Sequence, residues 1–170
     1  MTFFDWLTGT KRPDDGVPAK TPAEVRADLL AVNRPTAPFI VRDGATENVD
    51  LVAEWRIVDA SWYEIFAKAD LKRVFKVLMK FDNQAKEVRS VDQEWSVEWH
   101  AGVPKLSLAA TWSRGQSRQV SFGRAYGITK QGHFGEVYRY NFSTAVIKTP
   151  LQDAATNAGW VWRGIAYGKL

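Results

Sequence analysis

The sequence predicts a mainly β fold of the α+β class, in which an antiparallel meander forms a barrel or a sandwich with two short capped helices. Apolar and polar residues alternate over several segments, which is typical of strands with one buried face. Two Thr-Pro pairs, each followed by Glu or Gln, have the pattern of helix starts. We expect a single β-rich domain at 21–170, preceded at 1–20 by an apolar peptide and a flexible linker.

The first helix is expected at 22–32. Thr21 can cap it, proline suits its first position, and Glu24 can reach back to the cap. The same pattern at Thr149-Pro150-Leu151-Gln152 predicts a second helix over 150–158, which Gly159 would end.

The strands are expected where the period of two is clearest. In the segment from Val91 to Trp99, we expect the carboxylates of Asp92, Glu94 and Glu98 to form a solvated face opposite the apolar residues. The other segments with this alternation are 51–57, 106–112, 137–142 and 160–167.

Residues 71–81 fit two interpretations. As a strand, they place Phe75, Val77, Met79 and Phe81 on one face; as a helix, they continue an apolar row from Ala67. The turn-like residues after Phe81 favour a strand paired in a hairpin, but the helix stays open.

Composition excludes several classes of protein. The 170 residues contain no cysteine, so the chain has no disulfide and no thiolate ligand for a metal. Its longest stretch without Asp, Glu, Lys or Arg is nine residues, so no transmembrane segment is expected. The start lacks the pattern of a signal peptide, and we expect a soluble, cytoplasmic protein.

The N-terminal peptide is apolar although a linker separates it from the domain. Phe3, Trp6 and Leu7 would share one face of a helical turn, with Phe4 beside them, and are candidates for docking a partner. Folding back onto the domain and resting on a membrane surface are the alternatives.

Tryptophan is the most distinctive residue type, with eight in the chain. Core and cross-strand packing is the simplest interpretation. The functional interpretation is an aromatic-lined site for an apolar or planar small molecule. Its candidate residues are Trp95, Trp99, Trp160 and Trp162.

Positive charge is concentrated late in the chain. The net charge is +4, yet residues 99–170 carry nine basic and two acidic side chains. Arg114, Arg118 and Arg124 are candidates for binding an anion, and together with nearby aromatic residues they suggest nucleic acid or an anionic surface as an alternative partner.

No catalytic, phosphate-binding or metal-binding motif occurs, and no cofactor is expected. His100 and His133 are too far apart in the sequence for one element to present both to a metal. The sequence therefore favours a non-catalytic module that binds a ligand or another protein. Nucleic-acid binding and an enzyme that uses His100 or His133 stay open.

Overall fold

The fold is described from a computed structural model, which covers residues 2–108, 114–115, 143–165 and 170. The strands are β1 (Phe39–Asp43), β2 (Leu51–Trp55), β3 (Arg73–Asp82), β4 (Glu87–His100), β5 (Val103–Leu108), β6 (Arg114–Gly115) and β7 (Val161–Gly164). The α-helices are α1 (Phe3–Thr8), α2 (Pro22–Leu30), α3 (Tyr63–Lys68) and α4 (Thr144–Asn157). Short 3₁₀ turns lie at Ala45–Glu47 (η1), Arg56–Val58 (η2) and Ala60–Trp62 (η3).

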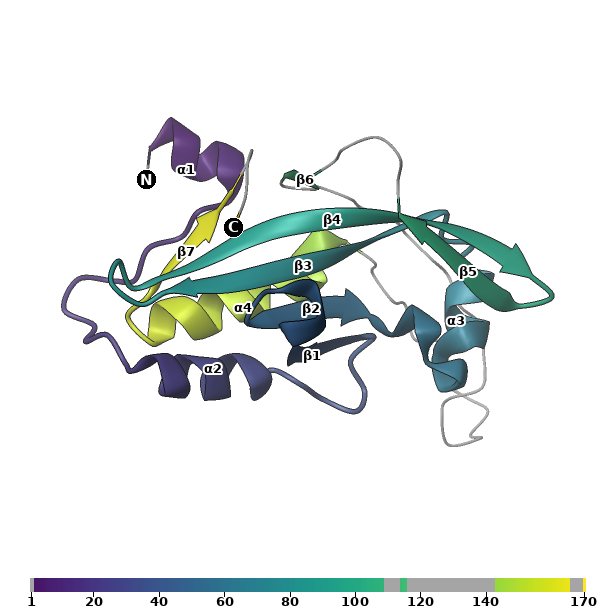
Figure 1. Cartoon of the computed structure of the whole chain (residues 1–170), viewed down its shortest axis with the longest axis horizontal. Helices are drawn as coiled ribbons and strands as arrows, with labels where there is room; N and C mark the ends of the chain where they lie inside the picture. Colours follow the sequence, from purple (N-terminus) through teal and green to yellow (C-terminus); the bar gives the residue numbers. More distant parts are fainter. Residues whose placement is uncertain (1, 109–113, 116–142, 166–169) are drawn as a thin grey trace.

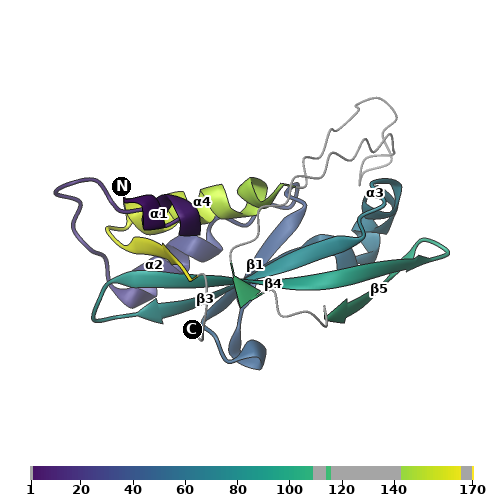
Figure 2. The same cartoon turned by 90° about the horizontal axis from the view of Figure 1, so that it is seen from above.

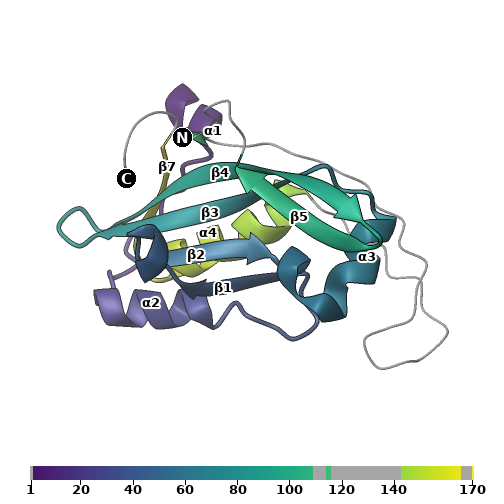
Figure 3. The same cartoon turned by 45° about the vertical axis from the view of Figure 1, so that its right-hand side comes forward.

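The strands form one curled, mainly antiparallel sheet with the order β1-β2-β3-β4-β5 (Figures 1 and 3). β4 is the longest strand and pairs with β3 along one edge. Along its other edge it pairs with β7, β6 and β5 in turn, and the pairing with β7 is parallel. The predicted mainly β, α+β fold is confirmed. The described strands form an open, half-barrel-like sheet.

Helices α2 and α4 lie on one face of this sheet, here called the inner face (Figure 2). Val25 and Leu29 of α2 and Ile147, Leu151 and Ala155 of α4 are buried at helical spacing in the main core. The outer face carries a second, smaller apolar cluster of Val52, Leu78 and Val91. The middle of the sheet is therefore buried on both faces.

Helix α2 confirms the predicted start, because Thr21 and Glu24 form both bonds of the capping box. The predicted start of α4 is wrong by six residues. The helix begins at Thr144 and contains Pro150 in its interior, where proline cannot donate a backbone hydrogen bond. Ile147, fully buried in the preceding turn, explains why the helix nevertheless extends through this position.

Residues 73–82 form strand β3, which confirms the strand interpretation of this segment. Every residue from Arg73 to Asp82 has a partner in β4, and four of them also pair with β2. Pairing on both edges satisfies the backbone hydrogen bonds that a helix would have made internally.

The solvated carboxylate face predicted for β4 is wrong at Asp92, which is 1% exposed and lies 2.5 Å from Nζ of Lys148 in α4. The predicted alternation of β4 was correct, since Asp92 does lie on the face opposite Val91. That face is the inner one, however, and α4 covers it at Asp92. Glu94 is half-buried and pairs with Arg73, and only Glu98 is exposed.

The segment that was expected to be a flexible linker, residues 8–20, is held at both ends by hydrogen bonds to the rest of the domain. The backbone of Lys11 exchanges two hydrogen bonds with that of Trp162 in β7. Further along, the amide of Lys20 donates to the carbonyl of Ala158, and the indole of Trp160 donates to the carbonyl of Lys20. The N-terminal segment thus runs against the C-terminal elements.

No helix in the described part of the chain has the length and apolar character needed to cross a membrane.

Candidate functional site

The four tryptophans predicted to line a ligand site lie in two separate places. Trp160 and Trp162 are fully buried in the main core, whereas Trp95 and Trp99 are half-buried on β4. Trp162 stands opposite Val88, and Trp95 lies seven residues further along β4, roughly 23 Å away at the usual rise of a strand. The structure therefore does not bring the four side chains together.

Trp160 has a clear structural role. Its ring packs edge-on against Phe81 at a centroid distance of 5.9 Å, and its Nε1 donates to the carbonyl of Lys20 at 2.8 Å. A buried indole that is bonded in this way holds the N-terminal segment against the core.

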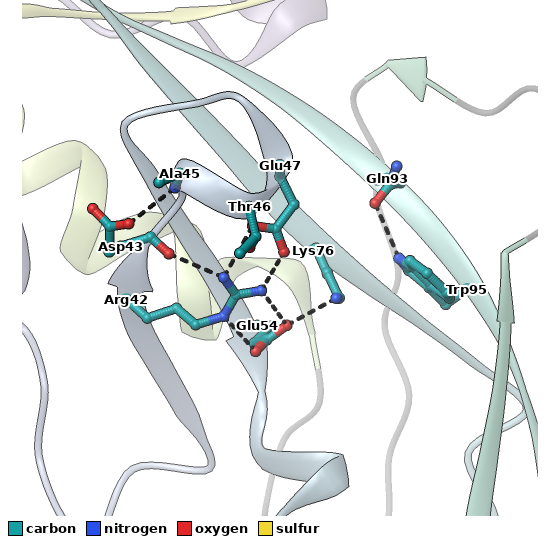
Figure 4. Close-up of polar contacts among 9 residues, drawn as sticks. All are labelled: Arg42, Asp43, Ala45, Thr46, Glu47, Glu54, Lys76, Gln93 and Trp95. Atoms are coloured by element: carbon teal, nitrogen blue, oxygen red, sulfur yellow. Dashed lines mark hydrogen bonds and ion pairs between the residues drawn. The ribbon is translucent and has the colours of Figure 1, made fainter.

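Trp95 belongs to a polar network on the outer face of the sheet (Figure 4). Its indole donates to the side chain of Gln93, and Nζ of Lys76 lies 4.7 Å from its ring centroid. Lys76 also pairs with Glu54, which in turn bonds to Arg42 at 2.8 Å. The network crosses four strands from β1 to β4.

The charges of this network are internally balanced. Arg42 donates to both Glu47 and Glu54, and these hydrogen bonds raise the pKa of its guanidinium. The hydrogen bonds from Arg42 lower the pKa of Glu47 to about 2. Two cations and two carboxylates satisfy one another, which suits a structural role on a sheet face better than acid–base chemistry.

The predicted anion-binding arginines cannot be assembled into a site. Arg114 is in β6, where its backbone pairs with that of Gln93 in β4, whereas Arg118 and Arg124 lie outside the described residues. His133 also lies outside them. His100 ends β4 with its side chain 68% exposed, 3.5 Å from a carboxylate oxygen of the equally exposed Glu98. Among the residues whose placement is described, no three His, Asp or Glu side chains gather as ligands for a metal.

Helix α1 carries the largest group of exposed apolar side chains in the described part of the chain. Phe3 is 69% exposed, Phe4 72%, Trp6 54% and Leu7 48%. Phe3 lies 6.0 Å from Phe4 and 6.1 Å from Trp6 between ring centroids. These four side chains form one continuous surface, here called the α1 face.

The opposite side of α1 is polar and is attached to the domain. Asp5 is 6% exposed and accepts hydrogen bonds from the amide of Thr2 and from Arg12. These bonds lower the pKa of Asp5, and the bond from the amide of Thr2 has the largest effect. Asp5 is therefore a carboxylate at neutral pH. The hydroxyl of Thr10 accepts from the amide of Gly164 in β7.

A third attachment comes from α4, where the side-chain amide of Gln152 donates to the carbonyl of Gly9. Helix α1 therefore docks through polar groups and presents its aromatic residues outward, the reverse of the usual arrangement for a surface helix. The sequence pattern identified Phe3, Trp6 and Leu7 as a set. It gave no indication that Asp5, Thr10 and Gln152 would hold them outward, because their partners lie far away in the sequence.

Comparisons of the chain with protein-family models, with curated proteins and with solved structures found no match. The proposal for its function therefore rests on the geometry of the described residues.

Proposed function

We propose that this protein is a non-catalytic binding module that contacts its partner through the α1 face. The observation that carries the proposal is the inverted docking of α1, with Asp5 buried and Phe4 exposed. Leaving aromatic side chains in water forgoes the stabilisation that their burial gives, at about 1.5–3 kcal/mol for each large side chain. An apolar partner surface would recover that stabilisation on binding.

The size of the surface supports the same proposal. Its exposed fractions correspond to roughly 400–500 Å² of apolar area, given typical side-chain surfaces. A patch of this size is typical of the largest apolar patch on a monomeric protein, about 300–600 Å², and such patches are often functional. Val58, Val103 and Leu108, the other large exposed apolar residues in the described ranges, are single side chains on other elements.

The alternative functions have less support. An exposed His100 beside an exposed Glu98 lacks the buried, oriented environment in which general acid–base catalysis operates. Binding of nucleic acid through the late basic residues stays a prediction, because Arg118 and Arg124 lie outside the described residues. A small-molecule site between the four tryptophans has no support from their positions, since two are core residues remote from the other two.

The experiment that tests the proposal is site-specific photo-crosslinking in cells that express the protein. A photoreactive phenylalanine analogue replaces Phe4, and the matched control carries it at Val103, which is 51% exposed in the β4–β5 hairpin. We expect adducts at position 4 to exceed those at position 103 by at least tenfold. We also expect Leu7→Ser in the same chain to reduce them. Equal yields at the two positions would overturn the proposal.

A further inference from the structure

We propose that the partner of the α1 face is the surface of an anionic lipid bilayer, into which Phe3, Phe4, Trp6 and Leu7 insert at the level of the headgroups. This inference rests on the proposed function and specifies the chemistry of the partner. It follows from three features of α1: the internally bonded polar groups near its ends, its size, and the cations that follow it in the chain.

Several polar groups at the two ends of α1 are bonded within the chain. At the first turn, Thr2 and Asp5 exchange side-chain and backbone hydrogen bonds in a capping box. At the last turn, the hydroxyl of Thr8 donates to the carbonyl of Phe4, and the amide of Thr10 donates to the carbonyl of Asp5. Unpaired backbone groups are costly in lipid, whereas a protein groove could supply partners for them. Each group that is bonded in this way adds no such cost when the helix enters lipid.

The dimensions of α1 fit the interfacial region of a bilayer. Its six residues are about 9 Å long, and interfacial helices bury their apolar face by about 5–10 Å. The face consists of phenylalanine, tryptophan and leucine, which interfacial helices carry on their apolar side, and tryptophan favours the headgroup level. Buried Asp5 lies on the opposite side, toward the domain, so insertion would not desolvate it further.

Cations lie where α1 meets the domain. Lys11 is exposed and lies three residues after the end of the helix, and Arg12 keeps a side-chain exposure of 52% while it pairs with Asp5. Exposed cations this close in the chain to the α1 face would complement the headgroups of anionic lipid. Asp14 and Asp15 follow in the loop toward α2, so the local charge is small and the apolar contact supplies most of the affinity.

The test uses the full-length protein and two kinds of vesicle, one of phosphatidylcholine alone and one with about 30% phosphatidylglycerol added to supply negative charge. Binding is measured by flotation and by the emission shift of tryptophan. We expect weak, reversible binding to the anionic vesicles, with a partition constant comparable to that of one acyl chain, about 10⁴ M⁻¹. Binding to the neutral vesicles should be several-fold weaker.

The variants separate the two contributions. Phe4→Ser should reduce binding at least tenfold, because it removes a large inserted side chain. Its matched control, Val103→Ser, removes an exposed apolar residue next to the turn of the β4–β5 hairpin and should leave binding unchanged. Lys11→Gln should reduce binding to the anionic vesicles about fivefold and leave the weak binding to neutral vesicles unchanged. Thermal unfolding of each variant checks that the domain is intact.

The outcomes distinguish the lipid inference from the proposed function. If the wild type binds neither kind of vesicle, or if Phe4→Ser and Val103→Ser behave alike, the lipid inference is wrong. Crosslinks to a protein, or to a second copy of this chain, from position 4 would then leave the binding function standing with another partner. If position 4 also gives no more crosslinks than position 103, both proposals fail.

Discussion

Replacing Gly159 by alanine should separate the N-terminal segment from the core. This glycine follows α4 with a φ of +74°, and a Cβ built on it would lie 2.5 Å from the carbonyl oxygen of Pro18 and 2.8 Å from Cα of Ala19. Both contacts are with backbone, which cannot rotate away as a flexible side chain can. The segment that carries the bond from Lys20 to Ala158 would have to move.

Two effects add to the expected loss of stability. An alanine in the left-handed region costs about 1–2 kcal/mol, which the reduced entropy of the unfolded chain offsets by about 0.4–1 kcal/mol. Forcing an extra carbon into a close-packed contact costs a further 1–3 kcal/mol, approximately. Gly159→Ala should therefore lower the free energy of unfolding by about 2–4 kcal/mol. Gly16→Ala is the matched control, since Gly16 has a φ of +82° but no atom within 4 Å of the added carbon.

Urea unfolding followed by tryptophan fluorescence measures both variants. We expect Gly159→Ala to be less stable than Gly16→Ala by about 1–3 kcal/mol, the contribution of the contact with Pro18 alone. Hydrogen exchange should show faster exchange of the Lys20 amide in the first variant. Equal stabilities of the two variants would refute the reasoning, because the cost would then come only from the backbone conformation.

Two other predictions concern the outer face and a hairpin. The pKa of Glu47 is about 2 in the folded protein, below its ordinary value of 4.5, so its pairing with Arg42 stabilises the fold above pH 4.5 and is lost as the pH falls toward 2. Urea unfolding between pH 7 and pH 3 should show a loss of up to about 2 kcal/mol that Glu47→Gln lacks, since the pairing is still partly present at pH 3. Ala101 has a φ of +49° beside Gly102 in the two-residue turn between β4 and β5. Ala101→Asn suits this turn and should stabilise the protein by about 1 kcal/mol, measured as a rise of 2–4 °C, approximately, in Tm; no rise would contradict this explanation.

The sequence was most informative where one local rule decided the structure. Alternation predicted β3 correctly, and the capping box at Thr21 predicted the start of α2. The same rules failed where a distant element intervened. Thr149-Pro150 resembles a helix start, but burial of Ile147 extends α4 through it. Asp92 was placed on the predicted face, yet α4 covers that face and supplies Lys148 as its partner.

The candidate site was only half predictable for the same reason. Spacing placed Phe3, Trp6 and Leu7 on one side of a helical turn, as the structure has them. Helical periodicity alone, however, predicts that such a face packs on the domain. Its outward orientation depends on Thr10 bonding to β7 and on Gln152 reaching Gly9 from α4, contacts that span more than 140 residues of sequence.

These long-range contacts change what kind of binding surface α1 can be. A peptide on a flexible linker loses conformational entropy when it binds, at about 1–2 kcal/mol for each residue that becomes ordered. Here Lys11 is paired to Trp162, and Lys20 is bonded to both Ala158 and Trp160, so the segment that carries α1 is already ordered at both ends. Most of this loss of conformational entropy therefore occurs when the protein folds and not when the α1 face binds its partner. Contacts such as that between Gly159 and Pro18, which touch no partner, should then influence binding through the position of α1.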